Sequence, residues 1–293
     1  MQDREKAFIR ALIQSGATEG IGDDGVLIAR DCAGYVVASD AFFEDVHFKR
    51  AWGSLEAIVE KCFAVNLSDI YAMNAIPSFC LLTLALPNGF KEVGRLANVI
   101  GKCALKHRIK IIGGDTIAGE KLHFSLTILG KRQGRILTRK GIKKGDILGY
   151  ISPNSVLTHC KTQAFGGNIK ALKTALRFHK NSKIQSNTRF AKPILYPKML
   201  LRLNGIARVG MDISDGIFME LSRLSRLNHL GFKITKYKGE WLYSPEEYQM
   251  LYAIPKMRLK KMKNLAKQYR HAFIPFAQAV CGRFMESKRN WHA

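Results

Sequence analysis

The sequence lacks the features that would carry it into or across a membrane. Its longest apolar run, residues 79–87, is interrupted by Thr83 and is only as long as a strand, whereas a bilayer-spanning helix needs about 20 apolar residues. The first residues contain no apolar core behind a basic region, so they do not form a secretory signal peptide. We therefore expect a cytoplasmic protein with no membrane partner.

Cysteine and histidine are too scattered to build a zinc site. The six cysteines include no pair with two residues between them, and the eight histidines include no pair at the spacing of a helical zinc motif. The same scatter argues against a disulfide framework. We expect buried, reduced thiols.

Acidic residues are scarce, and the scarcity is uneven along the chain. There are 47 Lys and Arg against 23 Asp and Glu, which gives a net charge of +24. Residues 1–130 hold 14 basic and 15 acidic residues, whereas residues 131–293 hold 33 basic and 8 acidic ones. This contrast predicts two domains, an N-terminal one over residues 1–135 and a strongly basic one over residues 136–293.

The basic half is compatible with nucleic acid, an acidic membrane surface or a polyanionic small molecule as a partner. A solvated surface explains it equally well, because its densest run, residues 256–263, has the pattern of an exposed helix face. No nucleic-acid-binding motif accompanies the charge, so we expect no nucleic-acid partner.

The chain also lacks a P-loop, a G-x-G-x-x-G turn and the protein-kinase motifs. Any phosphate site must therefore use other groups.

Hydrophobic periodicity predicts an α/β protein with mixed sheets. Apolar runs of strand length lie between amphipathic segments with helical spacing, and Ser54 is placed to cap one of the helices. The predicted strands are residues 26–29, 35–39, 79–86, 109–112, 123–130, 147–151 and 211–214. The predicted helices are residues 5–14, 55–69, 91–107, 164–179 and 217–230, and a last one that begins near residue 256 before an irregular end.

Aspartate gives the clearest chemical signal. Seven of the eleven Asp residues lie in short motifs with Gly, Ser or Thr, and several of these motifs directly follow a predicted strand, where sheet proteins place ligands. Bare carboxylates are the ligands that Mg²⁺ prefers. The pattern therefore predicts a site for Mg²⁺ and a polyanion. The motifs are Gly22-Asp23-Asp24-Gly25, Ser39-Asp40, Ser68-Asp69, Gly113-Gly114-Asp115-Thr116 and Asp212-Ile213-Ser214-Asp215-Gly216.

Six ordered blocks over most of residues 16–230 resemble the thiamine-monophosphate kinases. They are Gly20-Ile21-Gly22-Asp23-Asp24, Ser39-Asp40 with His47-Phe48, residues 64–73 around Asn66-Leu67-Ser68-Asp69, Gly113-Gly114-Asp115-Thr116, Leu137-Thr138-Arg139, and Asp212-Ile213-Ser214-Asp215-Gly216. The resemblance implies the two-domain fold shared with aminoimidazole ribonucleotide synthetase, selenophosphate synthetase and the hydrogenase-maturation dehydratase. In that fold the N-terminal domain forms a homodimer through its sheet.

The resemblance also implies an activity: Mg²⁺-dependent transfer of the γ-phosphate of ATP to thiamine monophosphate, which yields thiamine diphosphate. The implied metal ligands are Asp24, Ser39, Asp40, Asp69, Asp115, Asp212 and Asp215, of which Asp69, Asp115 and Asp215 are the implied catalytic residues. The implied ATP contacts are Gly114, Asp115, Arg139 and Ser214, and the implied contacts to the thiamine substrate are His47, Glu246 and Trp291.

Two segments depart from the family pattern. Residues 151–155 lack the glycines of the family's Gly-x-Leu-Gly-Asp-Ser stretch, and Ser244-Pro245-Glu246-Glu247-Tyr248 stands where the family has Gly-Gly-Glu-Asp-Tyr. Two alternatives therefore stay open. One is another ATP-dependent enzyme of the same fold that acts on a different phosphate or amide. The other is a non-catalytic basic protein that binds nucleotide or RNA.

Overall fold

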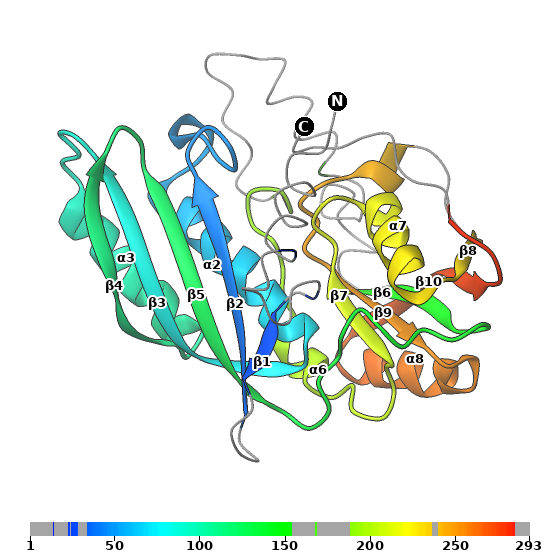
Figure 1. Ribbon diagram of the computed structural model, residues 1–293. Coiled ribbons are helices and arrows are strands. Elements are labelled where there is room, and N and C mark those ends of the chain that lie inside the picture. The colour runs from blue at the N-terminus through cyan, green and yellow to red at the C-terminus, as the bar shows by residue number, and fades with distance from the viewer. Residues whose placement is uncertain are drawn as a thin grey trace.

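The computed structural model describes residues 14, 23, 25–28, 34–153, 168, 188–235 and 240–284. Two five-stranded sheets, each with helices against it, make up these residues (Figure 1). The first sheet is built from strands before residue 135 and the second from strands after it. The predicted α/β class with mixed sheets is confirmed.

The first sheet has the strand order β1-β2-β5-β3-β4. Its pairs are antiparallel except for β3 and β4, which run parallel and are joined by a helical crossover. Figure 1 shows α2 and α3 together on one side of this sheet, so that its other side is open. The elements are β1 (Val26–Ile28), β2 (Tyr35–Phe43), α2 (Leu55–Ala72), β3 (Ala75–Pro87), α3 (Val93–Lys106), β4 (Lys110–Gly119) and β5 (His123–Arg132).

Helix α2 is the central element of the molecule. Ser54 caps it as predicted, because its side chain accepts a hydrogen bond from the Ala57 backbone N–H at 3.3 Å. Fourteen of its eighteen residues are buried, far more than one amphipathic face would hide. The reason is that α2 contacts the first sheet on one side and strands β7 and β9 of the second sheet on another.

The second sheet has the order β7-β9-β6-β10-β8, and all of its pairs are antiparallel. Alternate side chains along one of its strands enter two different cores. On β9, Met250, Tyr252 and Ile254 join the large core around α2, whereas Leu251 and Ala253 join a smaller core under α7. The elements are β6 (Ile147–Pro153), α6 (Pro197–Leu200), β7 (Val209–Asp212), α7 (Ile217–Asn228), β8 (Gly231–Ile234), β9 (Met250–Ile254), α8 (Leu259–Gln268) and β10 (His271–Val280), with short 3-10 turns at Arg50–Trp52, Glu240–Tyr243 and Lys256–Arg258.

Several sequence expectations need correction. Residues 109–112 were expected to be a buried strand ending at the Gly113-Gly114-Asp115 motif, but β4 continues through the motif to Gly119 and is exposed, because it is the edge strand. The irregular end expected after the last helix contains β10, whose Pro275 lies beside a register shift that accommodates it. Helix α7 ends at Asn228 with His229 in the left-handed conformation, before the expected stop at Gly231.

Other expectations stay untested. The predicted helix 5–14 and most of the predicted helix 164–179 lie outside the described residues. The division at residue 135 stays a prediction, since the large core draws residues from both sides of it. In the described part of the chain, no helix is long and apolar enough to cross a membrane.

Candidate functional site

Two of the predicted metal ligands, Asp40 and Asp69, meet between the first sheet and α2. Asp40 is on the face of β2 that points to α2, and its carboxyl group shares a hydrogen bond with that of Asp69. Burial raises the pKa of Asp40, and the hydrogen bond with Asp69 and the charge of His47 oppose part of the rise. Asn66 supports the pair, since its Oδ1 accepts from the Asp40 backbone N–H at 3.2 Å.

This carboxyl pair fits a hard cation. Two neighbouring carboxylates repel each other. A divalent ion between them would neutralise this repulsion, and oxygen ligands of this kind suit Mg²⁺. Within the described residues, however, no three side chains of the His, Cys, Asp or Glu type stand together at metal-binding range.

Asp212 approaches the same place from the second sheet. It is buried at the end of β7, and its Oδ2 accepts a hydrogen bond of 2.7 Å from Ser68, the residue before Asp69 on α2. The Ser68 hydroxyl also lies 2.6 Å from the carbonyl oxygen of Val65. Ser68 therefore ties the two halves of the site together, a role that its motif did not suggest.

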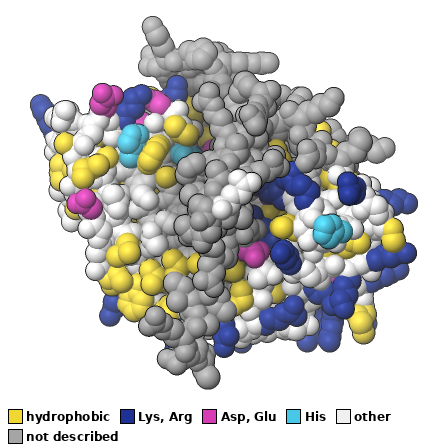
Figure 2. Space-filling view, viewed as in Figure 1, with side chains coloured by type: hydrophobic (Ala, Val, Ile, Leu, Met, Phe, Trp, Pro, Cys, Tyr) yellow, Lys and Arg dark blue, Asp and Glu magenta, His cyan; other side chains and the backbone are white. Residues whose placement is uncertain are grey.

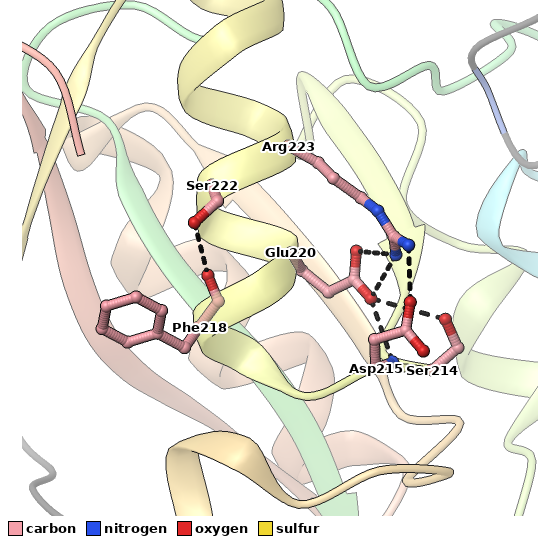
Figure 3. Close-up of polar contacts among 6 residues, drawn as sticks. All are labelled: Ser214, Asp215, Phe218, Glu220, Ser222 and Arg223. Carbon is pink, nitrogen blue, oxygen red and sulfur yellow. Dashed lines mark hydrogen bonds and ion pairs between the residues drawn. The ribbon is translucent and has the colours of Figure 1, made fainter. Parts of the chain in front are cut away.

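Asp215 belongs to a charged network at the start of α7 (Figure 3). Its Oδ2 lies 2.5 Å from Nη2 of Arg223, while Nη1 of Arg223 donates to both carboxylate oxygens of Glu220 at 2.9 Å. Oε1 of Glu220 also accepts from the Asp215 backbone N–H at 3.2 Å and lies 3.4 Å from the Ser214 hydroxyl. Figure 3 shows the three charged side chains converging on the turn that leads into α7.

In this network the guanidinium of Arg223 pairs with two acids at a buried helix start. Burial alone would lower the pKa of Arg223, but the negative charges of Glu220 and Asp215 raise it above its ordinary value. Glu220 has no exposed side-chain surface, so the guanidinium is its main compensation. Because Arg223 already holds one oxygen of Asp215, this carboxylate fits a metal less well than the Asp40–Asp69 pair does.

Tyr248 shows how closely the acids are gathered. Burial raises the pKa of its hydroxyl well above the ordinary value, and four carboxylates add to the rise: those of Glu246, Asp212, Asp40 and Asp215. The structure therefore brings together acids from β2, from the β7–α7 turn and from the segment before β9. Residues that are far apart in the chain become one negatively charged site.

Arg139 lies beside the first sequence motif. Its backbone N–H donates to Oδ1 of Asp23 at 2.5 Å, and its carbonyl oxygen accepts from the side chain of Asn228 at 2.9 Å. The preceding residue, Thr138, forms a bridge to Val209 at the start of β7. The Leu137-Thr138-Arg139 block is therefore held against the second sheet and against the block that contains Asp24.

Three predicted residues lie on or near the open side of the first sheet. Ser39 is next to Asp40 on β2 and so points the opposite way, where its hydroxyl lies 2.8 Å from that of Thr127. Asp115 pairs with Thr83, which pairs with Ser125 and through it with Ala41, so Asp115 also faces away from Asp40. It is three strands from β2, about 14 Å at the usual strand spacing.

Gly114, the neighbour of Asp115 on the edge strand, has a positive φ of 141°. A Cβ atom there would lie 1.8 Å from the carbonyl oxygen of Leu82, so this position requires glycine. Two other predicted residues, Asp24 and Trp291, lie outside the described residues.

His47 and Glu246 are two of the residues predicted to contact the thiamine substrate. Nδ1 of His47 accepts from the Phe43 backbone N–H at 3.0 Å, and its ring stacks on Phe42 with the centroids 5.6 Å apart. Oε2 of Glu246 lies 2.5 Å from Nζ of Lys61 on α2. Both residues therefore lie near Lys61 of α2, and their contact with the substrate stays a prediction.

Sequence reasoning missed Lys61, Ser68, Glu220 and Arg223. Lys61 had a visible signal, because it is the only basic residue in an otherwise apolar and acidic helical segment, residues 55–72. Glu220 and Arg223 had a weaker one, an acid and a base three residues apart on a helix that follows the Asp-Gly turn. Ser68 had none, because its partner is 144 residues away.

Comparisons with known proteins find relatives over most of the chain. Residues 22–131 match the family described as AIR synthase related protein, N-terminal domain. Thiamine-monophosphate kinase of Bacillus subtilis is 27% identical over 236 residues, covering 78% of this chain and 70% of the relative. Thiamine-monophosphate kinase of Buchnera aphidicola subsp. Schizaphis graminum is 29% identical over 275 residues, covering 85% of this chain and 81% of the relative.

A solved structure supports the same fold. The structure described as AaThiL complexed with AMPPCP and TMP aligns with a TM-score of 0.79 at 19% identity, and the alignment covers 99% of this chain and 97% of that one. At this identity the likeness concerns the fold, which extends over both sheets. The chain thus has a mixed α/β fold with two sheets like that of the solved structure, and it is related in sequence to the thiamine-monophosphate kinases.

Proposed function

We propose that this protein is a phosphotransferase that uses ATP and Mg²⁺ to convert thiamine monophosphate to thiamine diphosphate. The observation that carries the proposal is the contact of Asp40 on β2 with Asp69 on α2, beside Asp212 on β7, which is hydrogen-bonded to Ser68 next to Asp69. The named relatives support the choice of substrates, since the solved relative contains AMPPCP and TMP.

The chemistry explains why the site is acidic and has no evident general base. The attacking atom is an oxygen of a phosphate that is already ionised, so no proton has to be removed before attack. The difficulty is to bring two polyanions together in line. Bound Mg²⁺ would neutralise this repulsion and the charge that develops on the leaving oxygen.

In this chain, Asp40, Asp69 and Asp212 are the residues that would hold the metal. We propose Asp24 as a further ligand and keep Asp215 as a catalytic residue that orders the start of α7. Arg139 and Ser214 would contact ATP, and His47, Glu246 and Trp291 would contact the acceptor. These assignments extend the family resemblance to the positions described above.

We further propose that the protein acts as a homodimer formed through the open side of the first sheet. Large apolar side chains are exposed there, including Ile76, Leu81 and Ile117, which are 41%, 41% and 52% exposed. Figure 2 shows hydrophobic side chains on the part of the surface that this sheet forms. An apolar sheet face of this kind is typical of an interface.

The dimer would also explain where Asp115, Gly114 and Ser39 act. Asp115 and Ser39 face away from the Asp40–Asp69 pair of their own chain, but they lie on the side that a second copy would cover. We propose that Asp115 and Gly114 of each copy complete the ATP site of the other. A site built from two chains would explain why Asp115 faces away from the Asp40–Asp69 pair of its own chain.

The test is the formation of thiamine diphosphate from thiamine monophosphate, ATP and Mg²⁺, followed by chromatography. We expect one product molecule for each ADP formed and no product when EDTA removes the metal. A folded protein that binds ATP but makes no thiamine diphosphate would contradict the proposal and favour another acceptor. Because the reaction consumes ATP, we expect the enzyme to work in the cytoplasm.

A further inference from the structure

Lys61 of α2 lies beside Glu246 and the carbonyl oxygen of His47. Among the described residues it is the only buried lysine, and its side chain is 5% exposed. A buried ammonium group is unfavourable unless other groups compensate its charge. The contacts of Lys61 therefore identify the groups that compensate its charge.

Its contacts come from both halves of the molecule. Nζ lies 2.5 Å from Oε2 of Glu246, 3.4 Å from the carbonyl oxygen of His47 and 3.7 Å from the ring centre of Phe190. The Phe190 ring in turn meets the edge of Trp52, with the centroids 5.9 Å apart. A carboxylate, a carbonyl and an aromatic face together compensate the charge of Lys61.

The segment around Glu246 has an unfavourable backbone conformation, which other contacts must stabilise. Glu246 and Tyr248 both have positive φ values, 55° and 46°, a conformation that side chains other than glycine adopt at a cost. Their backbone N–H groups donate to the carbonyl oxygens of Ser214 at 2.6 Å and Ile213 at 2.8 Å. The segment is therefore fixed to the turn between Asp212 and Asp215, and Lys61 adds a contact from α2.

The same side of α2 makes both polar contacts to the second half. Lys61 and Ser68 are seven residues apart, which is two helical turns, so they lie on one face. Ser68 reaches Asp212 and Lys61 reaches Glu246. This face of the helix thus sets the distance between the metal-binding acids and Glu246.

We propose that Lys61 is a positioning residue for the acceptor substrate. By holding Oε2 of Glu246, it leaves Oε1 to the acceptor. A carboxylate oxygen suits a ligand with an exocyclic amino donor and a positively charged ring, which thiamine monophosphate has. The inference rests on the proposed function, because it concerns the acceptor of that reaction.

The experiment compares Lys61→Met, Lys61→Arg and Glu246→Gln with the wild-type protein. Binding of thiamine monophosphate is measured by calorimetry without ATP, and KM for ATP is measured in the full reaction. We expect Lys61→Met and Glu246→Gln each to raise Kd for thiamine monophosphate by about 30-fold, while KM for ATP changes less than about twofold. Lys61→Arg keeps the charge and should recover most of the affinity.

Two further variants make the test specific. The double variant Lys61→Met/Glu246→Gln should bind no more weakly than the worse single variant, because the two residues act as one unit. Lys106→Met, which removes an exposed ion pair with Glu60 elsewhere on α2 and α3, should leave Kd unchanged. If Lys61→Met does not fold, Lys61→Arg and Glu246→Gln still give the comparison.

Three outcomes would overturn the role of Lys61. Unchanged Kd with a lower kcat would mean that Lys61 acts on the transferred phosphate. Equal weakening of both substrates with a lower melting temperature would mean a structural role only. Additive losses in the double variant would separate Lys61 from Glu246. A wild-type protein that binds thiamine monophosphate but makes no product would contradict the proposed function and leave these tests valid.

Discussion

The two sides of the first sheet differ in nearly every property that matters for the site. The side that faces α2 carries Asp40 among buried apolar residues, where Asp69 hydrogen-bonds to it and His47 interacts with its charge. The open side carries Asp115 and exposed Leu81 and Ile117, and the whole edge strand β4 is exposed. One side is covered by helices of the same chain, and the other exposes apolar side chains to solvent.

The comparison teaches that neighbours in a motif need not share a site. Ser39 and Asp40 are adjacent, yet a strand sends their side chains to opposite sides. The predicted ligand set therefore divides into Asp40, Asp69 and Asp212 on one side and Ser39 and Asp115 on the other. The predictions below test this division, beginning with the largest expected effect.

Asp69→Asn should remove catalysis and leave the fold intact. Loss of a metal-binding carboxylate costs several kcal/mol of transition-state stabilisation, so we expect kcat to fall by a factor on the order of 10³. Stability should not decrease, because Asn can still hydrogen-bond to Asp40 and the repulsion between the two carboxylates is gone. Product formation and urea unfolding measure the two effects. Near wild-type turnover would remove Asp69 from the site.

Mixed dimers would show whether the open side belongs to the partner's site. Asp69→Asn and Asp115→Asn should each be inactive alone. If Asp115 acts across the dimer, co-refolding equal amounts should restore about a quarter of wild-type activity, since half of the dimers are mixed and each has one intact site. Activity that stays at the level of the single variants would place Asp115 in its own chain's site.

Gly114→Ala should disturb the edge strand that presents Asp115. Its Cβ would clash with the backbone of Leu82, and φ is in the region that favours glycine, so we expect a loss of about 3 kcal/mol in the free energy of unfolding. Gly101→Ala is the matched control, because α3 leaves open space there. It should stabilise by about 0.5–1 kcal/mol. A tolerated Gly114→Ala would mean that the strand relaxes at this position.

Arg223→Gln should have a smaller effect, on the side of the site that faces the second sheet. It leaves buried Glu220 and Asp215 without their guanidinium. Because the Arg223 side chain is 25% exposed and water can screen part of the charge, we expect a loss of about 2 kcal/mol. Lys263→Gln, at an exposed position of α8, should change stability by less than about 0.5 kcal/mol. Equal losses in both variants would show that the network of Arg223 with Glu220 and Asp215 does not stabilise the protein.

Much of the fold followed from local pattern. The capped helix after Ser54, the helix after Asp215-Gly216 and most strands of the first sheet were predictable, because periodicity and capping are properties of short segments. Strand β10 was missed, because Pro275 reads as a strand breaker and only the register shift beside it shows how the sheet accepts it.

The site was predictable in its residue types and chain positions, and its grouping was not. By itself the sequence determined that several aspartates, a basic second half and a family pattern point to phosphate chemistry with Mg²⁺. Only the tertiary structure decided that Asp40 meets Asp69, that Ser68 meets Asp212 and that Lys61 meets Glu246. The physical reason is that local sequence sets which way a side chain points along its own element, whereas the pairing of strands and the burial of α2 between two sheets decide which distant side chains share a face.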